Sequence, residues 1–75
     1  MSEVVVNLSW DDDAAVWMAT SEDVRGLILE SGSFDALIER VKFAAPELMG
    51  LNAQEIGQET LSILFKSEKY VQVRI

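Results

Sequence analysis

The chain has 75 residues, so it is one domain at most, and a domain this short buries only about 60% of its unfolded surface. It contains no Cys and no His, which excludes disulfides and the usual zinc ligand sets and removes the commonest acid–base and nucleophile pairs. The hydrophobic share of 49% is ample for a core, so disorder is not expected. A partner subunit or another bound protein is the expected support for so small a fold.

The formal net charge is −7, and it is unevenly distributed. Residues 1–35 carry eight acids against Arg25 alone, giving −7, whereas residues 60–75 carry three bases against Glu68, giving +2. Such an acidic surface repels phosphate backbones and attracts basic proteins. We therefore expect no direct nucleic-acid binding and a basic protein as partner, with acidity for solubility as the alternative explanation.

No segment is long and apolar enough for a membrane span, and the apolar run at residues 4–6 is too short for a signal peptide. The expectation is a soluble protein that does not bind membranes, with the cytoplasm as the default location.

Residues 3–10 alternate between apolar and polar side chains and predict a half-buried strand, and residues 15–20 are extended again after an acidic turn. A four-residue loop at residues 11–14 would place Trp17 opposite Leu8 and Trp10 opposite Ala15, so that both indoles share the apolar face. A five-residue loop would put Val16 and Met18 on that face instead of Trp17. We favour the four-residue loop.

A polar loop at residues 21–26 precedes a third short strand at residues 27–30. The longest helical period follows, over residues 33–51, with Ser33 as N-cap and Asp35 facing the helix dipole. The apolar stripe of this helix consists of Phe34, Leu37, Ile38, Val41, Ala45, Leu48 and Leu51.

Pro46 conflicts with that helix because it removes a backbone donor and clashes with the preceding turn, at a cost of about 3 kcal/mol in a regular helix. Since the stripe continues in phase beyond it, we predict one helix kinked near Ala45. The alternative is a break, with a new helix starting at Pro46. Gly50 and Asn52 are expected to mark the end.

The remaining chain predicts a loop at residues 52–58 and a terminal hairpin, in which strands 59–65 and 70–75 flank a turn at residues 66–69. The order is β-β-β-α-β-β within a single domain over residues 1–75, an α+β fold with one amphipathic helix on a small, antiparallel-rich sheet. The face without a helix is a candidate oligomer interface. Its apolar residues are Val5, Val16, Met18, Ile28 and Leu64.

The acidic run Asp11, Asp12 and Asp13 is the only carboxylate cluster. The spaced pattern of a calcium loop is absent, so a solvated turn is favoured over partner contact and over a metal site. A structural loop is likewise favoured over partner recognition for Glu22 and Asp23. No phosphate-binding glycine loop occurs, and without a candidate base the serines are not nucleophiles. We expect no catalytic residue, metal or cofactor, and hence no enzyme.

The order of these features over residues 10–37 resembles the HicB-like antitoxin family. An acidic turn leads into a small-aromatic-small strand at residues 11–19, and an acidic loop that closes on Gly26 leads into a strand and a capped helix at residues 21–39. The later Ala45-Pro46-Glu47-Leu48 and Asn52 are more similar to a short branch of uncharacterised bacterial domains of unknown function. Glu22, Asp23 and Arg25 stand where the antitoxins tend to have prolines.

The resemblance implies a truncated RNase H-like fold without catalysis, which binds a small basic RNA-cleaving toxin, often as a dimer or tetramer. Promoter binding is not carried over from the family, because no C-terminal helix-turn-helix or ribbon-helix-helix segment follows Ile75 in this sequence. Three hypotheses result. The first is a protein-binding module that sequesters a toxin-like basic protein through Asp11, Asp12, Asp13, Glu22 and Asp23. The second is an orphan, self-associating structural domain, and the third and most remote is a metal-dependent nuclease.

Overall fold

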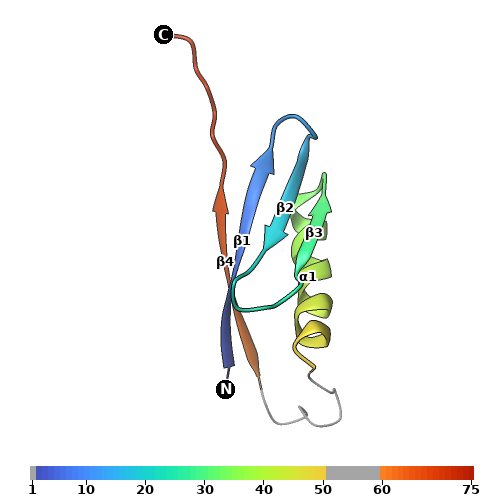
Figure 1. The fold of residues 1–75 in the computed structure, drawn as a ribbon. Helices are drawn as coiled ribbons and strands as arrows, with labels where there is room; N and C mark the ends of the chain where they lie inside the picture. The colour runs from blue at the N-terminus through green and yellow to red at the C-terminus, as the bar shows by residue number, and fades with distance from the viewer. Residues whose placement is uncertain (1, 51–59) are drawn as a thin grey trace.

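The computed structural model describes residues 2–50 and 60–75. It contains, in chain order, β1 (Ser2–Asp11), β2 (Val16–Thr20), β3 (Ile28–Ser31), α1 (Phe34–Leu48) and β4 (Leu61–Glu68). The strands form one sheet in the order β3-β2-β1-β4, in which β1 runs antiparallel to β2 and parallel to β4. The helix lies against one face of this sheet (Figure 1). The predicted α+β fold, with a single helix on a small sheet, is confirmed.

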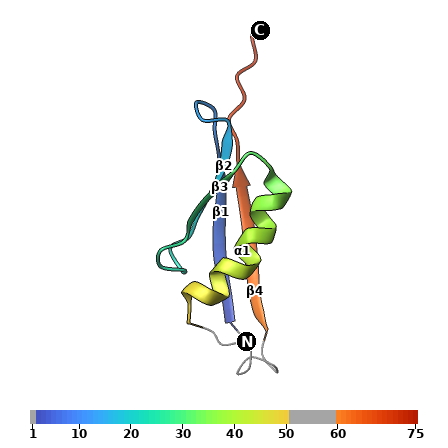
Figure 2. The same ribbon diagram turned by 90° about the vertical axis from the view of Figure 1, so that its right-hand side faces the viewer.

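The core lies between α1 and the even-numbered side chains of β1. Val4, Val6 and Leu8 are buried there, because successive residues of a strand point to opposite faces. The helix contributes its predicted stripe, of which Leu37, Val41 and Ala45 are fully buried. Figure 2 shows α1 crossing the sheet obliquely. Further core residues are Ala19, Val24 and Leu27.

The helix begins and ends at the expected signals. The Ser33 hydroxyl accepts a hydrogen bond from the Ala36 amide at 3.2 Å, which confirms the N-cap, and Asp35 lies in the first turn. Pro46 lies inside the helix, so one continuous helix is confirmed rather than a second one starting at this residue. Gly50 ends it with a φ of 75°, a conformation that favours glycine. Leu51 and Asn52, the expected last residues, lie outside the described residues.

The first hairpin has the predicted loop length but a different register. The loop spans residues 12–15, and Trp10 pairs with Trp17 while Leu8 pairs with Ala19. The predicted pairing was therefore wrong by two residues, although the predicted sharing of one face by both indoles is confirmed. Asp11 remains in β1 because its carboxylate closes the turn from there, accepting the Asp13 and Ala14 amides. Ala15 has a φ of 55°, which shows that the turn ends in a left-handed conformation.

The predicted terminal hairpin is wrong. β4 continues through the expected turn to Glu68, and residues 69–75, here called the C-terminal tail, form no strand and extend away from the sheet (Figures 1 and 2). Among the residues that dominate turns, which are Gly, Pro, Asn, Asp and Ser, the segment 66–69 contains only Ser67. β1 pairs with β4 as far as Ser9, which lies opposite Glu68. A β4 that continues to Glu68 therefore makes more backbone hydrogen bonds than one that turns at residue 66.

The described part of the chain contains no helix that is long and apolar enough to cross a bilayer.

We expect Leu37→Ala to lower the free energy of unfolding by about 2–5 kcal/mol, because it opens a cavity in a fully buried site. Phe43→Ala is the matched control on the same helix, since the Phe43 side chain is 77% exposed. It should change the stability by less than about 0.5 kcal/mol. Urea denaturation measures both, and equal losses in the two variants would contradict this packing.

Candidate protein-binding surfaces

The acidic turn between β1 and β2 is held together by its own carboxylates. The Asp11 Oδ1 accepts the backbone amides of Asp13 at 3.0 Å and Ala14 at 3.2 Å. The Asp12 Oδ1 accepts the indole N–H of Trp10 at 2.7 Å. Two of the three acids therefore form the turn, and the three carboxylates do not converge on one point. Within residues 2–50 and 60–75, no group of three ligand-type side chains could hold a metal ion.

The two tryptophans link this hairpin to the start of the helix. Their rings lie edge to face, with centroids 5.5 Å apart, and Trp17 makes a similar contact with Phe34 at 4.9 Å. The ammonium group of Lys69 lies over the Trp10 ring, 4.7 Å from its centroid. Such aromatic pairs are worth about 0.5–1.5 kcal/mol each beyond the buried area. The two indoles therefore anchor the packing of the hairpin against the start of the helix.

The second acidic loop, residues 21–27, closes an open edge of β1. β2 pairs with β1 only from Asn7 onward, which leaves the backbone of the preceding residues without a strand on that side. The Ser21 hydroxyl donates to the Val5 carbonyl at 2.6 Å, and the Asp23 Oδ2 accepts the Val5 amide at 2.7 Å. The loop therefore takes the place of a strand beside the first half of β1, where Figure 1 shows it.

This loop also contributes to the core, which sequence reasoning missed. Val24 and Leu27 are almost completely buried, and Gly26 lies close to Leu48 at the end of α1 with a φ of 83°. The Ser21 hydroxyl additionally accepts the Asp23 and Val24 amides. Two apolar residues three positions apart within a polar loop were the only signal in the sequence for this packing.

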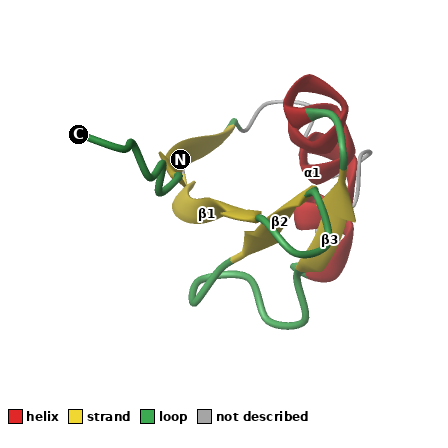
Figure 3. Ribbon diagram, turned by 90° about the horizontal axis from the view of Figure 1, so that it is seen from above, coloured by secondary structure: helices red, strands yellow, loops and turns green. Residues whose placement is uncertain are grey.

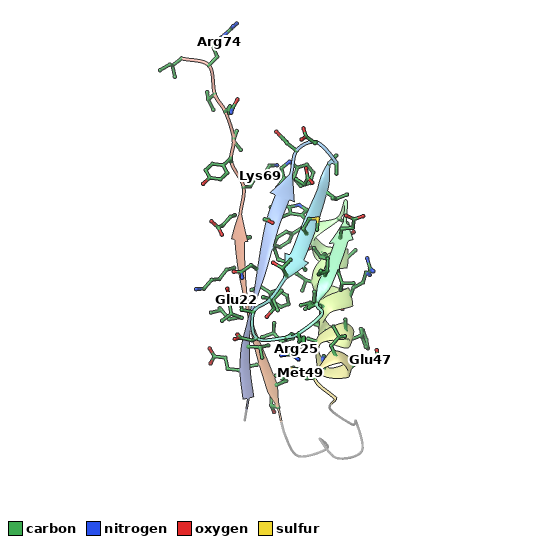
Figure 4. The ribbon with its side chains drawn as sticks, in the orientation of Figure 1. Glu22, Arg25, Glu47, Met49, Lys69 and Arg74 are labelled. Atoms are coloured by element: carbon green, nitrogen blue, oxygen red, sulfur yellow. The ribbon has the colours of Figure 1, made fainter. Side chains whose placement is uncertain are left out.

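The five acids chosen as partner-binding residues thus fall into two groups. Asp11, Asp12 and Asp23 accept hydrogen bonds that shape the fold. Asp13 and Glu22 are exposed, and their carboxylates accept no hydrogen bond from the described residues. The two loops lie at opposite ends of β2, roughly 15–20 Å apart for a strand of this length. They form two separate acidic sites, and Figure 4 shows Glu22 beside the sheet rather than at the hairpin tip.

The sheet face away from α1 carries the residues proposed as an oligomer interface. Val5 and Leu64 are neighbours across β1 and β4, and Ile28 and Leu64 are 69% and 47% exposed. Polar side chains separate most of the others: Met18 lies between Ser9 and Glu30. Figure 3 shows that α1 lies on one side of the sheet. We call the other side, with Val5, Val16, Met18, Ile28 and Leu64 together with Glu3, Asp11, Glu30 and Glu68, the open face.

Comparison with known proteins gives the family but no activity. A family model described as "Domain of unknown function (DUF1902)" matches residues 3–75. The chain belongs to this family. No curated protein matches it. Among solved structures, it is similar to a hypothetical protein, TTHA1013, from the extremely thermophilic bacterium Thermus thermophilus. The TM-score is 0.66 at 27% identity, covering 97% of this chain and 99% of that one. Neither match names the HicB family, so the resemblance to the antitoxins stays a prediction.

We expect Asp23→Ala to lower the free energy of unfolding by about 1 kcal/mol, because it leaves the Val5 amide without its acceptor. Hydrogen exchange of the Val5 amide should be faster in this variant. Glu22→Ala is the neighbouring control and should affect neither quantity. Unchanged exchange at Val5 in the Asp23 variant would show that the loop does not close this edge.

Proposed function

We propose that this DUF1902 domain is a non-catalytic protein-binding module whose partner is a small basic protein. By its resemblance to HicB-type antitoxins, the partner class is a basic RNA-cleaving toxin that the domain sequesters. The binding surface consists of the open face and of the acidic loops at the two ends of β2. Asp13 and Glu22 are the loop residues available to a partner.

The observation that carries this proposal is the composition of the open face. Apolar side chains such as Ile28 and Leu64 are exposed there, and the carboxylates of Glu3, Glu30 and Glu68 come from the same face of the strands, alongside the ammonium group of Lys66. Protein interfaces combine apolar contacts with polar groups in this way. The surplus of seven negative charges in residues 1–35 would accelerate encounter with a basic protein and favour it over acidic ones.

An orphan domain that associates only with itself is the second candidate function. It is favoured by the small size of the chain, by the exposed apolar residues of the open face and by those of the C-terminal tail. Purification of the tagged protein from its native host, followed by mass spectrometry, separates the two candidates. The module proposal expects a small basic protein in a stoichiometric amount, whereas the orphan domain would elute only with copies of itself.

With such a partner in hand, we expect the double variant Asp13→Lys and Glu22→Lys to weaken binding at least tenfold and to reduce its dependence on salt. Both positions are free of structural side-chain hydrogen bonds in the described chain, so the fold should be retained.

The control is Glu39→Lys with Glu47→Lys, two exposed positions on α1. Glu39 gives up only an exposed ion pair with Lys42, worth about 0.5 kcal/mol. Each replacement of an acid by Lys raises the net charge by two, so both double variants change the net charge from −7 to −3. Titration calorimetry at two salt concentrations compares them. If the two doubles lose affinity equally, binding depends on net charge alone and the acidic loops are not the contact surface.

A further inference from the structure

The C-terminal tail is an extended apolar segment without a strand partner among the described residues of its own molecule. Tyr70 is 92% exposed, Val71 68% and Val73 75%. Apolar and polar side chains alternate from Val71 to Ile75, the period of a strand with one buried face. The molecule measures 54 × 19 × 18 Å, and the tail forms one end of its long axis (Figure 1).

The tail does not complete the sheet of its own chain. β4 runs without a reversal to Glu68, and the tail then extends away from the sheet instead of folding back on β4 (Figure 1). On the other side, β1 pairs with β4 up to Ser9 opposite Glu68 and ends at Asp11. Continuing the same register, Lys69 lies beside Trp10, as its contact with that ring shows. Beyond Tyr70 there is no further residue of β1 to pair with.

The outer edge of β4 is also unpaired among the described residues. β4 is eight residues long and stands at the end of the sheet, and Leu64 on it is 47% exposed. Edge strands of this length present unpaired amides and carbonyls to other chains and are usually shortened, covered or charged. The molecule thus has both an open edge and a segment with strand character.

We propose that the tail of one copy adds as an antiparallel strand to the outer edge of β4 in a second copy, giving a symmetric dimer. The exchange is mutual, so the tail of each chain pairs with β4 of the other chain. The two sheets then join into one, with both helices on the same side. This inference does not rest on the proposed function, since it uses the outer edge of β4 and leaves the part of the open face around Ile28 and Glu30 uncovered.

The side-chain pattern selects one register for this ladder. If Glu68 pairs with its counterpart across the two-fold axis, Val71 faces Phe65, Val73 faces Ile63 and Ile75 faces Leu61 of the second copy. All three partners are half-buried and lie on the helix side of β4. A shift by two residues in either direction loses one of these apolar pairs. Cross-strand apolar pairs are the main source of stability in such ladders.

Charge favours the same arrangement. The tail contains Lys69 and Arg74 and no acid, so it carries +2, whereas the rest of the chain carries −7 − 2 = −9. In the proposed register Arg74 lies opposite Ser62, whose neighbour on β1 is Glu3. The long guanidinium side chain can reach that carboxylate over the small serine. Lys66 lies diagonally opposite Glu68 of the second copy. Its positive charge offsets the repulsion between the two Glu68 carboxylates.

The first test is the mass in solution. Light scattering at tens of micromolar should give twice the monomer mass of 8.4 kDa for the full chain and a monomer for Val73→Asp. Gln72→Asp is the matched control, because it adds the same charge to the other face of the tail and should remain dimeric. A monomeric parent chain would overturn the proposal, as would a dimer that survives Val73→Asp unchanged.

The second test uses the absence of cysteine from the chain. A chain with Ile63→Cys is mixed with one carrying Val73→Cys and oxidised, and the expected product is a disulfide-linked dimer of one chain of each kind. Gln72→Cys in place of Val73→Cys should not cross-link. When Ile63→Cys and Val73→Cys are combined in one chain, a covalent dimer supports the exchange. A cross-linked monomer would show that the tail forms a hairpin within its own chain. A dimer without a cross-link would show that the interface lies elsewhere. Either result overturns the proposal.

Discussion

The fold depends on β1 having partners along both edges. Its outer side pairs with β4 from Ser2 to Ser9, and its inner side pairs with β2 only from Asn7 to Asp11. The remaining inner edge is closed by side chains of the loop at residues 21–27 rather than by a strand. The bond to the Val5 amide is exposed and the bond to its carbonyl is part-buried, so each is worth on the order of 1 kcal/mol, and the loop takes the place of a strand along this part of the edge. Val24 and Leu27 then fill the core beneath the end of the helix.

This role of the loop changes how the acidic residues are interpreted. Asp11, Asp12 and Asp23 are fixed by hydrogen bonds to the backbone or to an indole, so they shape the surface more than they offer charge to a partner. The negative charge of the first 35 residues nevertheless remains, because the exposed carboxylates outnumber Arg25. The same acidic residues can therefore contribute both to the local structure and to long-range attraction. Among the five loop acids, only Asp13 and Glu22 carry charge without a structural hydrogen bond from the described residues.

Periodicity and capping residues were sufficient to predict the helix, its N-cap at Ser33 and the face that each strand turns to it, because these features depend on neighbours within a few residues. The sequence was also sufficient to predict that both indoles lie on one face of the first hairpin. It was not sufficient to predict which residues pair, because the pairing depends on which carboxylate closes the turn. The packing of Val24 and Leu27 was missed because it depends on an edge of β1 that only the topology leaves open. Strand alternation was sufficient to predict which residues lie on the open face. That polar side chains separate its apolar residues could be seen only once the register of all four strands was known.

The predicted terminal hairpin was wrong for a reason that bears on assembly. The alternation of residues 70–75 predicted a strand, whereas the structure shows no strand in the C-terminal tail. In the proposed dimer the apolar face of the tail is buried against a second copy, because residues 66–69 lack Gly, Pro, Asn and Asp and β1 pairs with β4 as far as Glu68. A chain with no cysteine, and a core limited by its length, gains most from such an exchange, because it extends the sheet and covers the exposed edge of β4 at once. The part of the open face around Ile28 and Glu30 would still be available to a basic protein, so self-association and partner binding need not compete for that surface.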